Sequence, residues 1–175
     1  MKRFGPKDET WALLYDKSDA DYISNLSPDS LFDLINKESD IFIQISKADD
    51  IVTFRGLSYC CQLITGDQTV RYTFMCVGSD GSVSSPFQQL LIAEAASRLN
   101  MSISGSMTRS GQALRFVGNF PASFQTITAR ESGVNTVSTP GAGILLNRNA
   151  FPTPIVHTAG VTAFTLATLI TFAGV

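Results

Sequence analysis

The clearest hydrophobic periodicity in the first third of the chain belongs to a helix. Leu31, Leu34 and Ile35 recur at spacings of three and four residues, which places them on one buried face. The dipeptide Ser27-Pro28 supplies an N-cap followed by a proline suited to the first helical position. The pattern predicts a helix that begins at this proline and ends near Lys37.

Strand-like patterns follow this helix. Ile41, Ile43 and Ile45 alternate with other side chains, which is the period-two pattern of a half-buried strand. Residues 51–77 contain two further apolar, β-branched stretches, separated by the polar turn Gly66-Asp67-Gln68. The sequence therefore predicts a β-hairpin over residues 51–77.

A second helix is predicted to begin at Ser85-Pro86, again a capping serine followed by proline. Apolar positions continue it along one side to about Asn100, at Phe87, Leu90, Leu91, Ala95 and Leu99. Glu94 and Arg98 would form a favourable pair one turn apart. The Ser- and Gly-rich residues 101–111 are expected to form a mobile loop. Short strands are predicted beyond it, at residues 114–118, 123–129 and 143–146.

Residues 1–26 are predicted to form a polar N-terminal arm. Trp11, Leu14 and Tyr15 belong to an apolar knot in this arm, and the knot must be buried against something. These three side chains are the candidate self-association residues, because an arm with one hydrophobic anchor can hold a neighbouring subunit. Docking of the knot onto its own domain is an equal alternative.

The C-terminal residues 149–175 contain no formal charge. Residues 155–175 are long enough to span a bilayer, but threonines and glycines dilute their hydrophobicity and no basic residue flanks them closely. Their Thr-rich, β-branched composition favours a segment packed in the core or in a subunit interface over a membrane anchor.

Together these elements predict an α+β fold, a single domain in which an antiparallel β-sheet is packed by two or more helices. A chain of 175 residues is long enough to bury one core of this kind. The expected organisation is an N-terminal arm over residues 1–26, a core domain over residues 27–148 and an apolar C-terminal segment over residues 149–175.

Charge is sparse and unevenly distributed. Charged residues make up 16% of the chain, so much of the surface must be uncharged and polar, which suits packing against copies of the same protein. After Lys47 every basic residue except the neutral His157 is an arginine. Five arginines are candidates for binding the phosphates of nucleic acid or of lipid head groups: Arg98, Arg109, Arg115, Arg130 and Arg148. Scattered, solvated arginines are the alternative interpretation.

Residues that usually carry catalysis are scarce. His157 is the single histidine, and its place in the uncharged tail favours a core or interface histidine over a catalytic one. Cys60, Cys61 and Cys76 lack the spacing of a zinc site or a disulfide framework and are expected to be free thiols. We therefore expect a non-enzymatic protein with no metal site, no cofactor and no small-molecule substrate.

The middle of the chain resembles the core of rhabdovirus matrix proteins, in particular the short ones of plant-infecting members. The resemblance rests on Leu31–Ile35, on Arg55–Tyr59 entering the predicted hairpin, and on Val70–Phe74 with the Ser79-Asp80-Gly81 turn after it. It covers roughly a third of the chain. It implies an antiparallel sheet packed by helices, self-association, condensation of a ribonucleoprotein and attachment to the inner face of an envelope. The chain departs from animal-virus members because it lacks a lysine-rich arm and a Pro-Pro-x-Tyr motif.

The first functional expectation is a viral structural protein of matrix type that self-assembles and bridges ribonucleoprotein to the inner face of a membrane. Its partners would be itself, a viral nucleocapsid or RNA, and an anionic membrane. Its location would be the virion and the host cytoplasm. A capsid or nucleocapsid subunit that binds RNA and a tail-anchored accessory protein are the alternatives, and an enzyme of unrecognised type ranks last.

Overall fold

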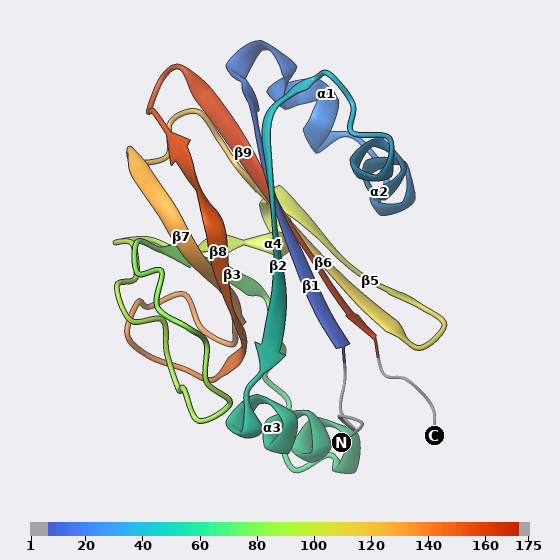
Figure 1. Ribbon diagram of the computed structural model, residues 1–175. Coiled ribbons are helices and arrows are strands. Elements are labelled where there is room, and N and C mark those ends of the chain that lie inside the picture. Colours follow the sequence, from blue (N-terminus) through green and yellow to red (C-terminus); the bar gives the residue numbers. More distant parts are fainter. Residues whose placement is uncertain (1–6, 172–175) are drawn as a thin grey trace.

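The computed structural model describes residues 7–171, which form nine strands and four α-helices (Figure 1). The strands lie in two antiparallel sheets in one domain, so the predicted α+β class is confirmed. In chain order the elements are β1 (Lys7–Asp16), the 3-10 helix η1 (Lys17–Asp19), α1 (Ala20–Ser24), α2 (Pro28–Asn36), β2 (Phe42–Val52), α3 (Phe54–Thr65), β3 (Phe74–Gly78), β4 (Leu99–Asn100), α4 (Met101–Ser104), β5 (Gly105–Ser110), β6 (Ala113–Phe120), β7 (Ile127–Asn135), β8 (Leu145–His157) and β9 (Thr162–Thr171).

The two sheets are joined at the end of β2. One sheet has the strand order β2-β1-β9-β6-β5, and the other has the order β4-β3-β7-β8. They meet where Ile51 and Val52 of β2 pair with Arg148 and Asn147 of β8. Away from this junction the sheets face one another, with hydrophobic side chains from both packed between them (Figure 1).

Two prolines keep the sheets separate along β2 and β8. Pro152 and Pro154 lie where β8 runs beside β2, and proline has no N–H to donate to a strand ladder. Side chains link the strands instead: the Ser46 hydroxyl donates to the Thr153 carbonyl at 2.6 Å, and the Gln44 amide donates to the Pro154 carbonyl at 2.9 Å. The sheets are therefore held together here without merging into one surface.

The two large parts of the hydrophobic core lie on opposite faces of the five-stranded sheet, and a small third cluster consists of Cys76, Leu91 and Leu145. Ala12 and Leu14 of β1 face the other sheet, whereas Leu13 and Tyr15 face α1 and α2. The helices cover this second face with Ile23, Leu31, Phe32 and Ile35. Because β1 is buried on both faces from Ala12 to Tyr15, its sequence there is a continuous apolar run instead of an alternating one.

The predicted N-terminal arm is wrong for residues 7–26, and residues 1–6 lie outside the described part of the chain. β1 is a central strand, paired with β2 on one side and with β9 on the other. An apolar run near the start of a chain looks like a docking anchor when only its sequence neighbours are considered. Its partner β9 comes from the opposite end of the sequence, and that pairing makes it a strand of the core.

Two predicted elements are confirmed where their signals are local. α2 begins at Pro28, after Ser27, whose hydroxyl accepts the N–H of Ser30. Leu31 and Ile35 of the predicted stripe are buried, and Leu34 is half-buried. The strand predicted at Ile41–Ser46 is present as β2, which continues to Val52.

The hairpin predicted over residues 51–77 is wrong. The segment instead forms α3, with the Thr53 hydroxyl accepting the N–H of Gly56 at 2.9 Å and with Gly66 at a positive φ closing the helix. Gly56 allows close packing against β8, since a Cβ there would lie 2.5 Å from the Leu146 carbonyl oxygen. The return strand of the predicted hairpin is present only in part, as β3.

The helix predicted to begin at Ser85-Pro86 is also wrong. Residues 79–98, all of which the structure describes, contain no helix, and a single turn remains where the Gln88 N–H donates to the Ser85 carbonyl at 3.1 Å. The segment lies against β3 instead, where the Ala95 N–H donates to the Val77 carbonyl at 2.8 Å. An apolar helical stripe does not decide the structure when the sheet offers hydrogen bonds that compete with the helix.

Later elements differ from prediction mainly in their limits. Residues 101–111, expected to be a loop, contain α4 and β5. The strand at residues 114–118 is confirmed within β6. Those at residues 123–129 and 143–146 begin later and extend further than predicted, as β7 and β8.

In the uncharged tail, β9 is buried in the domain itself between β1 and β6, whereas the turn of residues 158–161 before it is exposed. The threonines of β9 bond to neighbouring strands: the Thr168 hydroxyl lies 2.7 Å from that of Thr10, and the Thr165 hydroxyl lies 2.9 Å from that of Tyr15. The Thr-rich composition therefore belongs to a central strand that is covered on both faces. No helix among the described residues is both long and apolar enough to cross a membrane.

Candidate interaction surface

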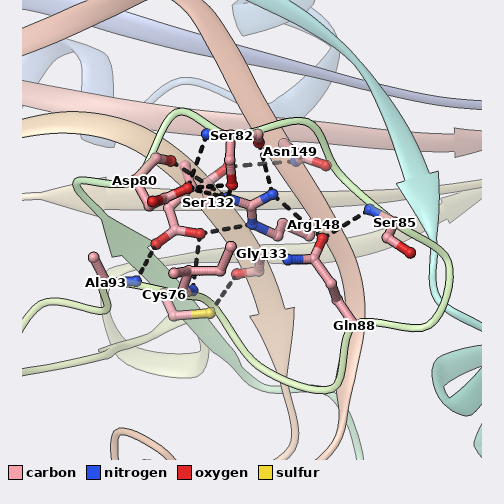
Figure 2. A network of polar contacts seen from close by, with 12 residues as sticks. Cys76, Asp80, Ser82, Ser85, Gln88, Ala93, Ser132, Gly133, Arg148 and Asn149 are labelled. Carbon is pink, nitrogen blue, oxygen red and sulfur yellow. Dashed lines mark hydrogen bonds and ion pairs between the residues drawn. The ribbon is translucent and has the colours of Figure 1, made fainter.

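The connection between β3 and β4, residues 79–98, is anchored by an ion pair on the sheet below it (Figure 2). The pair consists of Glu131 from β7 and Arg148 from β8, and both side chains are fully buried. Gly133, two residues after Glu131, is the strand partner of Arg148, so the two charged side chains lie on the same face. The Arg148 Nε donates to the Glu131 carboxylate at 2.7 Å.

The loop closes over this pair with its own polar groups (Figure 2). The Glu131 carboxylate accepts the N–H groups of Ile92 at 3.1 Å and Ala93 at 2.7 Å. The Arg148 guanidinium donates to the Asp80 carboxylate at 3.0 Å and to the Ser82 carbonyl at 2.8 Å. A buried charge without partners costs several kcal/mol, so the ion pair determines where these loop residues lie.

The Asp80 carboxylate is held in the charged form that this arrangement needs. The Ser82 hydroxyl and N–H both donate to it, and these bonds lower the pKa of Asp80, with the Arg148 charge lowering it further. The start of the loop therefore carries a fixed negative charge that faces the buried guanidinium.

A second ion pair ties the end of the loop to the β7–β8 connection. Arg98 donates to the Glu94 carboxylate through two nitrogens, one of them at 2.9 Å. Arg98 also donates to the carbonyls of Val137 at 2.8 Å and Ala142 at 3.0 Å, and Glu94 accepts the Gly141 N–H at 2.9 Å. The predicted Glu94–Arg98 contact therefore exists, although the helix expected to produce it does not.

The outer face of this anchored loop carries exposed aromatic side chains. Phe87 of the loop and Phe54 at the start of α3 pack edge to face, with ring centres 5.2 Å apart, and are 77% and 55% exposed. The Phe54 N–H donates to the Pro86 carbonyl at 2.8 Å, and Arg55 donates to the Gln89 side chain at 3.0 Å. Helix and loop thus hold the two rings together, and we call Phe54 and Phe87 the aromatic knob.

The combination of buried charges and exposed rings points to a contact surface. Val83 of the same loop is 89% exposed, so apolar exposure is not confined to the knob. Large apolar groups held at the surface of a folded domain commonly mark interaction sites. A loop that only connected two strands would need neither two ion pairs beneath it nor aromatic rings on top.

A hollow of about 510 Å³ lies near the other end of β2, beside the end of α2. Its apolar lining consists of Trp11, Ile35, Phe42, Ile43 and Ile45. Ile43 is 61% exposed. Glu38 and Lys47 supply charges at the same hollow, and the Lys47 ammonium lies 5.1 Å from the centre of the Trp11 ring and 2.8 Å from the Glu9 carboxylate.

Phosphate binding, predicted for five arginines, is corrected for Arg98 and Arg148. Both guanidinium groups are buried and lie in the ion pairs of the loop, so neither can reach an external phosphate. The pattern of basic residues could not reveal this, because the carbonyls and carboxylates that bind them come from other strands and loops.

The other three arginines are dispersed. Arg115 pairs with Asp29 of α2, and its guanidinium lies 5.3 Å from the centre of the Phe32 ring. Arg109 and Arg130 are exposed, but they lie in β5 and β7, which belong to different sheets. Arg109 donates to the Gly111 carbonyl at 3.0 Å. The structure therefore does not gather the predicted arginines into one basic surface.

The predicted self-association residues divide into core and surface. Leu14 and Tyr15 are buried, and the assignment of these two to an intersubunit contact is corrected. Burial raises the pKa of Tyr15 to about 12, although its hydrogen bond to Thr165 opposes the shift. Trp11 is half-buried, packs edge to face on Phe32 and lines the hollow, so its role in self-association stays a prediction.

His157 is a buried residue of the core. Its Nε2 lies 3.1 Å from the Phe124 carbonyl and its Nδ1 lies 3.1 Å from the Thr162 hydroxyl. Burial lowers its pKa, which favours the neutral ring, with Nε2 as donor and Nδ1 as acceptor. Phe124 and Phe164 lie beside the ring.

The cysteines are free thiols in different settings. Cys76 is buried, and burial raises its pKa and that of half-buried Cys60, the latter to about 11, whereas Cys61 is exposed. Among the residues that the structure describes, no group of three His, Cys, Asp or Glu side chains could hold a metal ion.

Asp8 is a buried carboxylate in a different situation from Glu131. It is 2% exposed, and neither carboxyl oxygen has a hydrogen-bond partner among the described residues. Burial raises its pKa from 3.8 to about 7, and the Glu9 charge adds to this rise. Asn147 lies close enough to oppose the shift without meeting full hydrogen-bond geometry, so loss of hydration dominates.

Sequence reasoning misses Phe54, Phe87 and Glu131 as residues of the surface and its support. Phe87 fits the buried stripe of a predicted helix, and Phe54 fits a strand of the predicted hairpin. Glu131 could have been found from the sequence. It is the only acidic residue between Arg98 and Arg148, a stretch that holds five arginines, and this makes it a natural ion-pair partner.

Comparison with known proteins finds no matching family model, no matching curated protein and no matching solved structure. The function must therefore be inferred from the geometry of the chain itself.

Proposed function

We propose that this protein is a non-enzymatic structural protein that assembles with copies of itself. The observation that carries the proposal is the aromatic knob, in which the exposed Phe54 ring at the start of α3 packs on the exposed Phe87 ring of a loop that buried ion pairs fix from below. Burial of large apolar side chains in a contact contributes roughly 1.5–3 kcal/mol each. Rings held in place before binding lose little conformational freedom on association, which favours the contact further.

A capsid or nucleocapsid subunit that binds RNA is less well supported. Such binding needs several basic side chains presented together to the phosphates. Arg98 and Arg148 are buried, and Arg109 and Arg130 lie in different sheets.

A tail-anchored accessory protein is less well supported for a related reason. Insertion of the tail into a bilayer would remove β9 from between β1 and β6. Both large parts of the hydrophobic core would lose residues, among them Phe164 from one and Ala167 from the other.

Within the class of assembly proteins, we favour a matrix-type protein that forms a layer between ribonucleoprotein and the inner face of a membrane, in the virion and the host cytoplasm. The low charge of the chain and its resemblance to rhabdovirus matrix proteins support this choice. One segment of the resemblance, Arg55–Tyr59, lies in the first turns of α3 and not in a strand. The likeness therefore rests on α2 and on the residues that lead into β3 and the turn after it.

Self-association through the knob is tested by sedimentation velocity over a concentration series. The wild-type chain is expected to sediment faster as its concentration rises, and the Phe54→Ser/Phe87→Ser variant is expected to sediment as a monomer throughout. The physical reason is the loss of the apolar surface that the contact would bury.

Ile64→Ser is the matched control, because Ile64 is 86% exposed and lies at the other end of the same helix. It should assemble as the wild type does. A wild-type chain that is monomeric at every concentration would contradict the proposal. An equal loss in the control would indicate nonspecific hydrophobic association in place of a defined surface.

A further inference from the structure

We infer that self-association is head to tail, with the aromatic knob of one copy inserting into the hollow lined by Trp11, Ile43 and Ile45 on the next copy. The inference rests on the proposed function and names the surface that receives the knob. We take a second copy of the chain as the occupant of the hollow, because the position, shape and charge of the two surfaces all favour it.

The knob and the hollow are kept apart by β2, which runs between them. The hollow lies along the first half of this strand, from Phe42 to Lys47, whereas Phe54 follows shortly after its end at Val52. Figure 1 shows α2 and α3 at opposite ends of the strand. Even the stretch of extended strand from Lys47 to Val52 spans about 17 Å at roughly 3.3 Å per residue, and the exposed Ile43 lies further away. The knob therefore cannot reach the hollow of its own chain, but it can reach that of a neighbour.

The shape and chemistry of the two surfaces are complementary. The knob offers the Phe54 and Phe87 rings, and the hollow offers an apolar floor that includes the Trp11 indole and the exposed Ile43. Its volume of about 510 Å³ lies within the roughly 300–1,000 Å³ of sites that bind apolar groups. Aromatic rings also pack well edge to face against other rings, as Trp11 does against Phe32.

One charge beside the knob and one at the hollow are opposite in sign, while Lys47, also at the hollow, is paired with Glu9 at 2.8 Å. Arg55 follows Phe54 and is exposed next to the knob. Glu38 is exposed at the hollow, where its positive φ of 48° turns the chain at the end of α2. A copy that inserts its knob thus brings a guanidinium towards a carboxylate, which favours this partner and this orientation.

A contact between two different surfaces does not close on itself. After two copies associate, one still has a vacant hollow and the other an exposed knob, so a third copy can join at either end. Such contacts generate rings or open assemblies, whereas a contact between identical surfaces would stop at a dimer.

Mixing two defective variants tests the inference. Phe54→Ser/Phe87→Ser lacks the knob, and Ile43→Asp places a charge in the hollow at a side chain that is 61% exposed. Thermal unfolding close to that of the wild type verifies that each variant is folded. Each is expected to be monomeric alone, and an equimolar mixture is expected to form a heterodimer and nothing larger, because only one knob and one hollow remain intact.

Charge reversal provides a second arm of the test. Glu38→Arg and Arg55→Glu should each raise the concentration of half-maximal assembly, by about tenfold if the pair is well aligned. The Glu38→Arg/Arg55→Glu double variant restores opposite charges and should return this concentration towards the wild-type value.

The outcomes separate the inference from the proposed function. A wild-type chain that never associates removes both. A wild-type chain that associates through the knob while Ile43→Asp assembles normally overturns the head-to-tail contact alone and indicates pairing between knobs. A mixture of the two variants that stays monomeric also overturns it.

Discussion

At the scale of single residues, the buried carboxylates show that spatial surroundings decide what a charged side chain does. Glu131 accepts a guanidinium and two backbone N–H groups, so its charge is fully compensated. Asp8 is buried between the sheets without a complete hydrogen bond, and its pKa rises to about 7. The same functional group, a carboxylate, therefore anchors a loop in one place and makes stability depend on pH in the other.

Asp8→Asn should stabilise the protein at neutral pH. The pKa of Asp8 is about 7 in the folded protein against 3.8 for the unperturbed group, so the folded chain binds this proton more tightly. The resulting stability is complete below about pH 4 and is lost as the pH rises to about 7. Asparagine is neutral at every pH, so the variant should gain on the order of 2–4 kcal/mol near pH 8 and almost nothing near pH 4. Thermal or urea unfolding at both pH values measures this gain.

Asp33→Asn is the control for this prediction, since Asp33 is an exposed carboxylate on α2. It should change stability little, and by a similar amount at both pH values. A stability difference between wild type and Asp8→Asn that does not vary with pH would show that Asp8 does not titrate as its burial implies.

At the scale of elements, the loop of residues 79–98 depends on charges that lie outside it. Arg148 and Glu131 belong to β8 and β7, yet they bind the backbone or side chains at both ends of the loop. Gly78, just before the loop, has no room for a side chain, because a Cβ there would lie 2.5 Å from the Ala93 carbonyl oxygen. The position of the knob is thus determined by the sheet and not by the loop sequence alone.

Arg148→Met should destabilise both the domain and the loop. The substitution leaves Glu131 buried without its guanidinium, a defect that typically costs about 3–5 kcal/mol. Urea unfolding should show this loss, and limited proteolysis should cut within residues 79–98 faster than in the wild type.

The double variant Arg148→Met/Glu131→Leu separates the ion pair from packing. It removes both charges, so it should recover a large part of the stability that the single variant loses. Proteolysis of the loop should nevertheless stay faster than in the wild type, because the partners of Ala93 and Ser82 are gone. A single variant as stable as the wild type would show that the pair does not hold the loop.

In the whole molecule, two apolar surfaces are left uncovered by the three layers, which are the helices α1 and α2, the five-stranded sheet and the four-stranded sheet. The helices α1 and α2 cover the five-stranded sheet on one face, and the four-stranded sheet covers the other. The hollow beside α2 and the knob beside α3 lie outside this coverage, near opposite ends of β2. A molecule of this design has its free apolar surfaces far apart, which favours extended assembly over a compact dimer.

Electron microscopy at high protein concentration is therefore expected to show extended assemblies of the wild-type chain. The Phe54→Ser/Phe87→Ser variant should show none under the same conditions, whereas Ile64→Ser should assemble as the wild type does. A uniform population of closed dimers would argue against growth through two different surfaces.

The fold class and two of the locally signalled elements could be predicted from the amino-acid sequence, whereas the equally local signal at Ser85-Pro86 gave a helix that is absent. The Ser27-Pro28 cap with its apolar stripe produces α2, because this pattern acts over a few neighbouring residues. The alternation at Ile41–Ser46 predicts the start of β2, but the side chains buried there are Phe42 and Ser46, while Ile43 is exposed. The scarcity of charge in the tail also indicated burial, although not the partners of the buried strand.

Which chain segments pair and which charges meet could be seen only once the chain was folded. β1 became a central strand because β9 pairs with it from the far end of the sequence, and Phe54–Thr65 became a helix that packs on β8 through Gly56. Arg98 and Arg148 look available for phosphates until the fold brings Glu94, Glu131 and loop carbonyls around them. The physical reason is that strand pairing and charge burial depend on distances in space, which residue type and spacing along the chain do not contain.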